Sequence, residues 1–239
     1  MPEFLQSIQN SIYINLVYED RYLFILRGFG MTLYLTVMTF LLGTGIGALF
    51  CRLRLLKNKT VPGLVVWFKN LFIRLPTLVL LIIFTYWLFS GTNIDTVTLA
   101  ILAFALKAGS YISDILYTAI TSVNRGEVEA GRALGMSSFK VFRLIVLPQA
   151  IKNALPVYKN QLIITMQETS LVGFLAINDL TRASQIITSR TMDPYISIII
   201  TVVAYLLIGG VFGMLFKIAE RDKHMEYAAF KKHAGEKSL

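Results

Sequence analysis

The sequence predicts an all-α integral membrane protein with five transmembrane helices. Of its 239 residues, 55% are hydrophobic, and the mean hydropathy is +0.63. Several apolar runs reach about 20 residues, the length that a helix needs to cross a bilayer. Basic residues are concentrated between these runs, as is typical of the loops of membrane proteins. A soluble domain of this length would not need so many long apolar segments.

The apolar runs place the five spans in order along the chain. We expect them at residues 28–50, 71–89, 97–120, 155–177 and 195–216, the fourth being the least hydrophobic. Residues 28–220 then form a transmembrane domain between an N-terminal segment, 1–27, and a tail, 221–239. The N-terminal segment has no basic region and short apolar core typical of a cleaved signal peptide, so we expect none.

The N-terminal segment carries apolar residues at near-helical spacing. These are Phe4, Leu5, Ile8, Ile12 and Leu16. The pattern fits an amphipathic helix at the outer membrane interface, and it fits a packed N-terminal helix equally well.

The distribution of lysine and arginine predicts the orientation of the chain. Basic residues follow the first, third and fifth spans, in the segments 51–59, 125–152 and 217–232. The segment SGTNIDT between the second and third spans contains none. The N-terminus is therefore expected outside and the C-terminus inside, which makes residues 121–153 cytoplasmic.

Other features narrow the class of protein. The net charge is +9, but the basic residues are spread between apolar segments, which argues against nucleic-acid binding. Cys51 is the single cysteine, so the chain has no internal disulfide. His224 and His233 lack metal-ligand spacing, and we expect no metal site. No G-x-x-x-x-G-K-[ST] phosphate loop is present, so the sequence predicts no ATP site of that kind in this chain.

Glycines and prolines suggest how the helices pack. Gly43 with Gly47, and Gly209 with Gly213, have the four-residue spacing that lets helices approach closely in lipid. Pro76 and Pro156 are expected near helix starts, where a missing N–H costs little.

The segment VEAGRALGMSSFKVFRLIVLP, residues 128–148, is the most polar part of the chain's interior. A short helix is expected over 126–134, ended by Gly135, because glycine tolerates the left-handed cap conformation. Ser137 or Ser138 then caps a second helix that ends near Pro148. Two interpretations remain open from the residues alone: a docking element for another protein, or an ordinary structured loop.

This segment resembles the EAA loop of the permease subunits of ATP-binding-cassette (ABC) importers. The family pattern, E-A-A, three residues, G, nine residues, I-x-L-P, corresponds to Glu129, Ala130, Gly131, Gly135, Ile145, Leu147 and Pro148. Every spacing matches, and Gly131 replaces the second alanine, which lowers helix propensity by about 1 kcal/mol.

The resemblance extends over residues 25–220 and is strongest to the polar amino-acid branch of that family. It is carried by IRLPTLVLL, AGSYISDILYTAITSVNRGEVEAGRALG, PQAIKNALPVYKNQLI and ETSL. The chain departs from the branch at Gln167 and Glu168, where K-D is usual, and at Tyr117, where a basic residue is frequent.

The resemblance implies a non-catalytic permease subunit of a bacterial cytoplasmic membrane importer, with the five-helix permease fold. Its partners would be a second permease subunit, identical or not, a pair of ATPase subunits that use ATP and Mg²⁺, and an external binding protein that delivers a polar amino acid. This chain itself would bind no cofactor. The ATPase-coupling contact would be made by Glu129, Ala130, Gly131, Arg132 and Gly135, with Arg132 or Lys140 pairing with acidic groups.

Two stripes of polar residues lie within the predicted spans. Lys107, Tyr111 and Asp114 share one face of the third span, and Gln161, Thr165 and Glu168 share one face of the fourth. Charges in lipid are costly, so we expect the stripes to face protein, water or each other. They indicate a polar substrate path, or else hydrogen bonding between helices. Lys107 is an alternative partner for Asp114, and Arg74 is expected to extend toward the interface.

Three rival functions remain open at this point. A permease for another small solute such as methionine would share the same loop. A secondary transporter driven by an ion gradient usually has internal repeats, and no clear repeat is present. A non-transporting receptor or assembly factor would use the loop only for docking.

Overall fold

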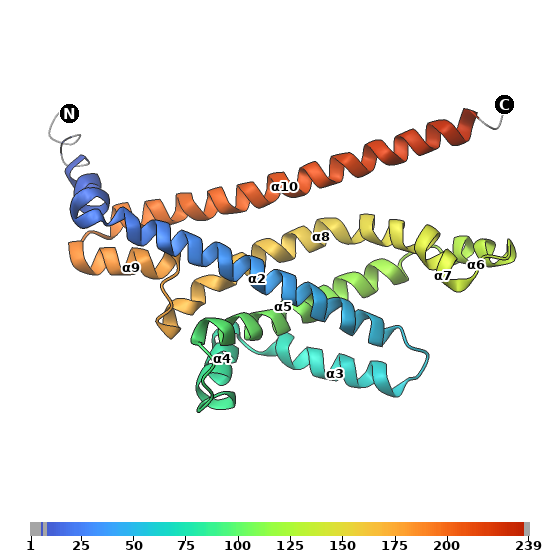
Figure 1. The fold of residues 1–239 in the computed structure, drawn as a ribbon, viewed down its shortest axis with the longest axis horizontal. Helices are drawn as coiled ribbons and strands as arrows, with labels where there is room; N and C mark the ends of the chain where they lie inside the picture. Colours follow the sequence, from blue (N-terminus) through green and yellow to red (C-terminus); the bar gives the residue numbers. More distant parts are fainter. Residues whose placement is uncertain (1–5, 7–8, 237–239) are drawn as a thin grey trace.

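The computed structural model describes residue 6 and residues 9–236, with side chains described as far as Lys217. In this part of the chain every element is a helix. Three helices are long and apolar enough to cross a membrane (Figure 1): α2 (Tyr22–Arg54), α5 (Thr96–Thr121) and the Pro194–Lys217 part of α10 (Pro194–Glu236). The structure therefore confirms an all-helical chain with several membrane-spanning helices.

Helices α2 and α5 form the tightest packing in the described chain, and glycines permit it. A Cβ added at Gly47 would lie 2.7 Å from Cγ2 of Ile112, and one at Gly109 would lie 2.8 Å from the carbonyl oxygen of Gly43. The predicted role of Gly43 and Gly47 in close packing is confirmed.

The second predicted glycine pair does not pack in this way. A Cβ at Gly209 would reach Met166 only at 3.8 Å, and nothing lies within 4 Å of one at Gly213. Within the described chain this pair makes no close helix contact, because only 11% of the membrane-length window of α10 is buried against the rest of the chain.

The second predicted span is broken into two helices. Helix α3 (Thr60–Arg74) is followed by α4 (Thr77–Ile82), which continues as the π-helical turn η3 (Ile83–Leu88), and the two parts meet at 105°. Leu75 is extended, with ψ of 134°, because a residue before proline is pushed out of the helical region. Pro76 thus precedes a helix start, as predicted, but an unbroken helix over 71–89 was wrong.

The cytoplasmic-loop prediction also changes at its end. Helix α6 (Arg125–Ala133) is followed by a turn. After the turn, α7 (Ser138–Val141), the π-helical segment η4 (Phe142–Val146) and α8 (Leu147–Glu168) follow one another without a break. The helix was expected to end near Pro148, and the fourth span to begin near residue 155. The wider turn of η4 precedes Pro148 and accommodates its missing N–H and its ring. Pro156 lies inside α8 and not at its start.

The number of membrane-spanning helices is lower than five by length and composition. Within the described residues, α3 with α4–η3 passes this test as a bent pair, which raises the number from three to four. Helix α8 does not pass, because polar residues are frequent along it: Lys152, Asn153, Lys159, Asn160, Gln161, Gln167 and Glu168.

The end of the molecule that holds the N-terminal segment is a compact cap of short helices. It contains η1 (Tyr13–Val17), η2 (Tyr18–Asp20), η5 (Thr169–Leu175) and α9 (Leu180–Thr191). The buried Asn15 side chain donates to Asp193 at 3.0 Å, and its oxygen accepts from Thr191 at 3.1 Å. Leu16 packs against the core beside α9, and Ile12 is exposed. Phe4, Leu5 and Ile8 lie outside the described residues.

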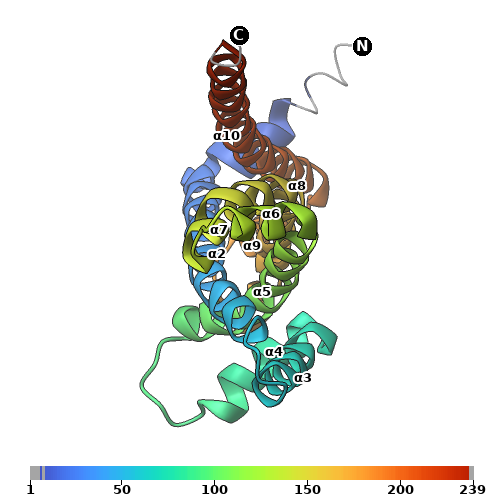
Figure 2. The same ribbon diagram turned by 90° about the vertical axis from the view of Figure 1, so that its right-hand side faces the viewer.

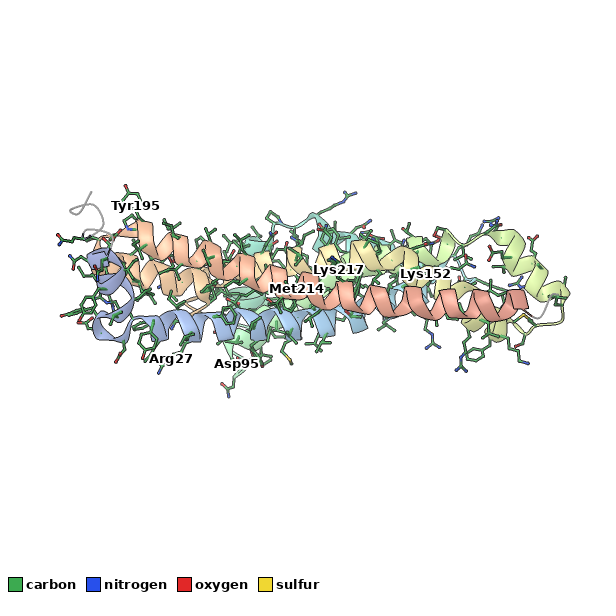
Figure 3. The ribbon with its side chains drawn as sticks, turned by 90° about the horizontal axis from the view of Figure 1, so that it is seen from above. Arg27, Asp95, Lys152, Tyr195, Met214 and Lys217 are labelled. Carbon is green, nitrogen blue, oxygen red and sulfur yellow. The ribbon has the colours of Figure 1, made fainter. Side chains whose placement is uncertain are left out.

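Helix α10 runs the length of the molecule. Tyr195 marks its start, and Lys217 lies near its middle, beyond which the helix continues toward the end that holds α6 and α7 (Figure 3). The described N-terminal segment and the last turn of α10 therefore lie at opposite ends (Figure 1). The side chains of His224, His233 and the rest of the tail lie outside the described ones.

We expect Gly47→Val to destabilise the fold by about 1–3 kcal/mol, because the added atoms overlap Ile112 in the α2–α5 interface. Gly45→Val on the same helix is the matched control, since nothing lies within 4 Å of a Cβ there. Thermal unfolding of the detergent-solubilised proteins measures the difference. Equal melting temperatures for the two variants would contradict the close packing.

Candidate functional site

The turn between α6 and α7 is built by a glycine C-cap. Gly135 has a φ of +79°, the left-handed region that glycine tolerates best. Its N–H donates to the Arg132 carbonyl at 2.9 Å, and the Met136 N–H donates to the Gly131 carbonyl at 3.1 Å. These two bonds form a Schellman motif. The prediction that Gly135 ends the first helix is confirmed.

Side-chain caps fix the starts of both helices. The Asn124 side chain accepts from the Gly126 N–H at 2.9 Å, and the Ser137 hydroxyl accepts from the Lys140 N–H at 3.4 Å. Of the two serines considered for the second cap, Ser137 fills the position. Helix, sharp turn and helix are therefore each specified by local sequence.

A small apolar core holds this element against the transmembrane helices. Val123, Val141 and Val146 are buried together. Gly131 faces them: a Cβ there would lie 2.6 Å from the Cδ1 atom of Ile145. The glycine that replaces the family's second alanine is thus covered by the end of a flexible side chain.

The outer surface of the same element combines charge with exposed apolar side chains. Among the predicted coupling residues, Glu129, Ala130, Arg132 and Gly135 are exposed, and Gly131 is buried. Leu134 is 84% exposed and Phe139 is 69% exposed. Large apolar side chains beside charges at a polar tip are typical of a protein-docking surface.

The two predicted polar stripes meet at one point, Lys107 of α5 and Glu168 of α8. The Lys107 Nζ atom lies 3.4 Å from Oε1 of Glu168, and the Thr77 hydroxyl donates to the same oxygen at 2.9 Å. Lys107 also donates to the Thr77 hydroxyl and, at 3.2 Å, to the carbonyl of Leu75. The ammonium group therefore lies at the break between α3 and α4.

The Lys107–Glu168 pair is largely buried, and the lysine is more buried than the glutamate. The Lys107 side chain is 7% exposed and that of Glu168 is 21% exposed. A buried ammonium is tolerated only with several acceptors, and Lys107 has three. The more exposed carboxylate leaves one face of the pair open.

Asp114 belongs to a second, separate cluster. It accepts from Arg54 of α2 at 2.7 Å and from Lys69 of α3 at 2.8 Å, and we call these three residues the Asp114 cluster. The Arg54 guanidinium also lies over the ring of Tyr117, 4.0 Å from its centroid. The alternative pairing of Lys107 with Asp114 is wrong, because each residue has its own partners on other helices.

The remaining candidates line α5 and α8. Gln161 and Thr165 are buried, and the Thr165 hydroxyl donates to the Gln161 carbonyl at 2.8 Å. The Gln161 Nε2 atom has no hydrogen-bond partner in the described part of the chain. Tyr111 is half-buried one helical turn beyond Lys107 and interacts electrostatically with Glu168. Arg74 is exposed at the end of α3.

The sequence did not identify three residues of the two ion-paired sites: Arg54, Lys69 and Thr77. Arg54 was grouped with the basic residues that follow the first span, and Lys69 was placed just before the expected second span, so neither was assigned a partner. A signal for Lys69 was present, since an unpaired lysine between Trp67 and Phe72 on an apolar helix needs a carboxylate partner. Thr77 could be found only once the chain was known to break at Leu75.

The chain is similar to proteins named as permease subunits of amino-acid transport systems. HisM, a histidine/lysine/arginine/ornithine transport system permease protein of Salmonella typhimurium, is 33% identical over 232 residues, which cover 92% of this chain and 96% of that protein. GlnP, a putative glutamine transport system permease protein of Rickettsia prowazekii, is 29% identical over 208 residues, covering 86% and 95%.

Solved structures agree. An amino acid ABC transporter crystallised with histidines matches with a TM-score of 0.76 at 29% identity, covering 83% of this chain and 94% of that one. An inward-facing MetNI methionine ABC transporter matches with a TM-score of 0.72 at 20% identity, which supports the fold alone. The family model described as "binding-protein-dependent transport system inner membrane component" matches residues 40–224. The chain belongs to this family of ABC transporter permeases.

Proposed function

We propose that this chain forms half of the translocation path of an importer for a polar amino acid. A second permease subunit completes the path, an external binding protein delivers the substrate, and two ATPase subunits hydrolyse ATP with Mg²⁺ to drive transport. The relatives named for histidine, lysine, arginine, ornithine and glutamine transport support this substrate class. Methionine is less well supported, because that likeness concerns the fold alone.

The observation that carries the substrate proposal is the Lys107–Glu168 pair. It places a positive and a negative group 3.4 Å apart between α5 and α8, with both side chains largely shielded from water. An amino acid presents the complementary pair, an ammonium and a carboxylate. In our proposal Glu168, with its exposed face, receives the substrate ammonium, and Tyr111, Gln161 and Thr165 provide polar groups along the same helices.

Asp114 takes a different role in this proposal. Two cations already occupy its carboxylate oxygens, which leaves little negative charge for a substrate. We assign the Asp114 cluster to holding α2, α3 and α5 together. This is the helix-to-helix bonding that was the second interpretation of the polar stripes.

The α6–α7 element is the proposed contact with the ATPase. Exposed Leu134 and Phe139 would enter an apolar depression on the ATPase, while Glu129, Arg132 and Lys140 pair at the rim. The opposite positions of the described N-terminal segment and the end of α10 support an odd number of crossings (Figure 1). The placement of the N-terminus outside rests on the distribution of basic residues. Counting α8 and the bent α3–α4 pair gives the five spans of the proposed fold.

The coupling role is tested by Gly135→Pro. Proline fixes φ near −65°, whereas this position requires +79°, so the turn cannot form. We expect ATP-driven uptake in proteoliposomes to fall more than about tenfold and ATPase co-purification to weaken. Gly135→Asn is the control, because asparagine tolerates the left-handed region. Normal uptake and docking with proline, or uptake driven by an ion gradient without the ATPase, would contradict the coupling proposal.

The substrate role is tested by Glu168→Gln. Loss of a charge-assisted hydrogen bond worth about 1.5–3 kcal/mol predicts a rise in the KM for uptake of about 10-fold or more. Gln167→Ala, at the exposed neighbouring position, should leave KM unchanged. If Glu168→Gln lowers only the yield of folded transporter, while KM stays at the wild-type value, the pair is structural and the path proposal fails.

The assignment of Asp114 is tested by Asp114→Asn. The change leaves Arg54 and Lys69 close together without a carboxylate, so we expect a loss of about 1–3 kcal/mol in stability, seen as a lower melting temperature, with the KM for substrate unchanged. Asp95→Asn is the control, because Asp95 is an exposed N-cap of α5 and asparagine caps equally well. A raised KM with an unchanged melting temperature would return Asp114 to the path.

A further inference from the structure

The hairpin between α2 and α3 concentrates positive charge without opposing charge of its own. Residues 50–74 contain no aspartate or glutamate, and their basic residues are Arg52, Arg54, Lys57, Lys59, Lys69 and Arg74. Arg54 and Lys69 are neutralised only in part by the single carboxylate of Asp114. Arg52, Lys57 and Lys59 are exposed and have no ion-pair partner among the described side chains.

An apolar groove lies beside this charge. It has a volume of about 310 Å³ and is lined by Phe50 of α2 and by Leu64, Val65, Trp67 and Phe68 of α3. The rings of Phe50 and Phe68 meet edge to face at 6.0 Å, and Trp67 is 63% exposed. In both views α3 stands on the side of the molecule away from α10 (Figures 1 and 2). The groove has no polar group to receive a hydrophilic ligand.

The basic residues come first along α3 and the apolar groove comes next, the same order as the headgroup and acyl chain of a lipid. Lys59 is the N-cap of α3, and Leu64 and Trp67 follow on the helix. With a rise of 1.5 Å per residue, their Cα atoms lie about 8 and 12 Å from that of Lys59 along the axis. A phospholipid has the same arrangement, a phosphate followed directly by hydrocarbon. A soluble anion would use the charges alone, and a neutral lipid would use the groove alone.

We propose that this hairpin is a binding site for an anionic phospholipid of the inner leaflet. The headgroup phosphate lies on Arg52, Lys57 and Lys59, and an acyl chain lies in the groove against Trp67. The proposal rests on the orientation given under the proposed function, which puts the hairpin at the cytoplasmic surface. Each basic residue near an anionic surface strengthens binding by about fivefold.

The position of the site gives the lipid a structural effect. Helix α3 carries the site near its first turn and ends at Leu75, whose carbonyl is bonded by Lys107. Lys69, midway along the same helix, binds Asp114. A lipid that fixes the start of α3 therefore restrains the helix that leads to both ion-paired sites.

Tryptophan fluorescence tests the site, because the chain has two tryptophans, Trp67 and Trp87. In full-length Trp87→Phe protein, reconstituted into vesicles, Trp67 is the single reporter. We expect dibromo-phosphatidylglycerol to reach half-maximal quenching at a mole fraction at least about fivefold below that of dibromo-phosphatidylcholine. Arg52→Gln/Lys57→Gln/Lys59→Gln should abolish that preference, and Leu64→Asn should weaken quenching by both lipids.

A control with equal loss of charge is Arg125→Gln/Arg143→Gln/Lys217→Gln, three exposed basic positions away from the hairpin, which should keep the preference. Equal quenching by both lipids would reduce the groove to ordinary lipid contact and overturn the proposal. Absence of quenching by either lipid would show a protein surface over the groove and overturn it too. ATP-driven uptake, measured on the Trp87→Phe parent protein, is independent: normal uptake by a parent protein that shows no lipid preference refutes the lipid site alone.

Discussion

Lys107 carries an ammonium group with almost no access to water, and the need to satisfy it organises the centre of the molecule. Three acceptors from two segments converge on it: the Leu75 carbonyl and the Thr77 hydroxyl at the break between α3 and α4, and the Glu168 carboxylate of α8. Removing an ion from water costs several kcal/mol, so no single partner would suffice. The chain break at Pro76 frees the Leu75 carbonyl from its helix, and the charge that needs an acceptor lies beside it.

The need of each buried charge for partners also explains why the polar residues of α5 belong to two separate sites. Lys107 and Asp114 are both on α5, two turns apart, and each is bonded to partners on other helices. Lys107 and Thr77 both bond the same oxygen of Glu168, Oε1, whereas Arg54 and Lys69 each bond a different carboxylate oxygen of Asp114, whose side chain is 40% exposed. Between them, glycines bring α2 and α5 into backbone contact, which leaves no room for sliding at that interface. The rigid part of the bundle and the open polar part are thus adjacent.

Periodicity and motif spacing correctly predicted an all-helical chain and the helix, turn and helix around Gly135. Gly135 could be predicted because one left-handed residue is enough to specify a helix end. Proline effects were harder, because the outcome depends on the neighbouring turn: Pro76 broke a helix, but Pro148 and Pro156 did not. The pairing of charges was not predictable, since Arg54, Lys69 and Asp114 are far apart in sequence, and only the packing of α2, α3 and α5 joins them.

From Ser138 to Glu168 the chain stays helical, through a π-helical segment and two prolines. At 1.5 Å per residue this helical segment is about 45 Å long, with Phe139 near one end and Glu168 at the other. If this helical segment tilted by about ten degrees about its loop end, the Glu168 carboxylate would move by about 8 Å. That is more than twice its separation from Lys107. A tilt of this size, with α5 held in place, would separate the Glu168 carboxylate from Lys107.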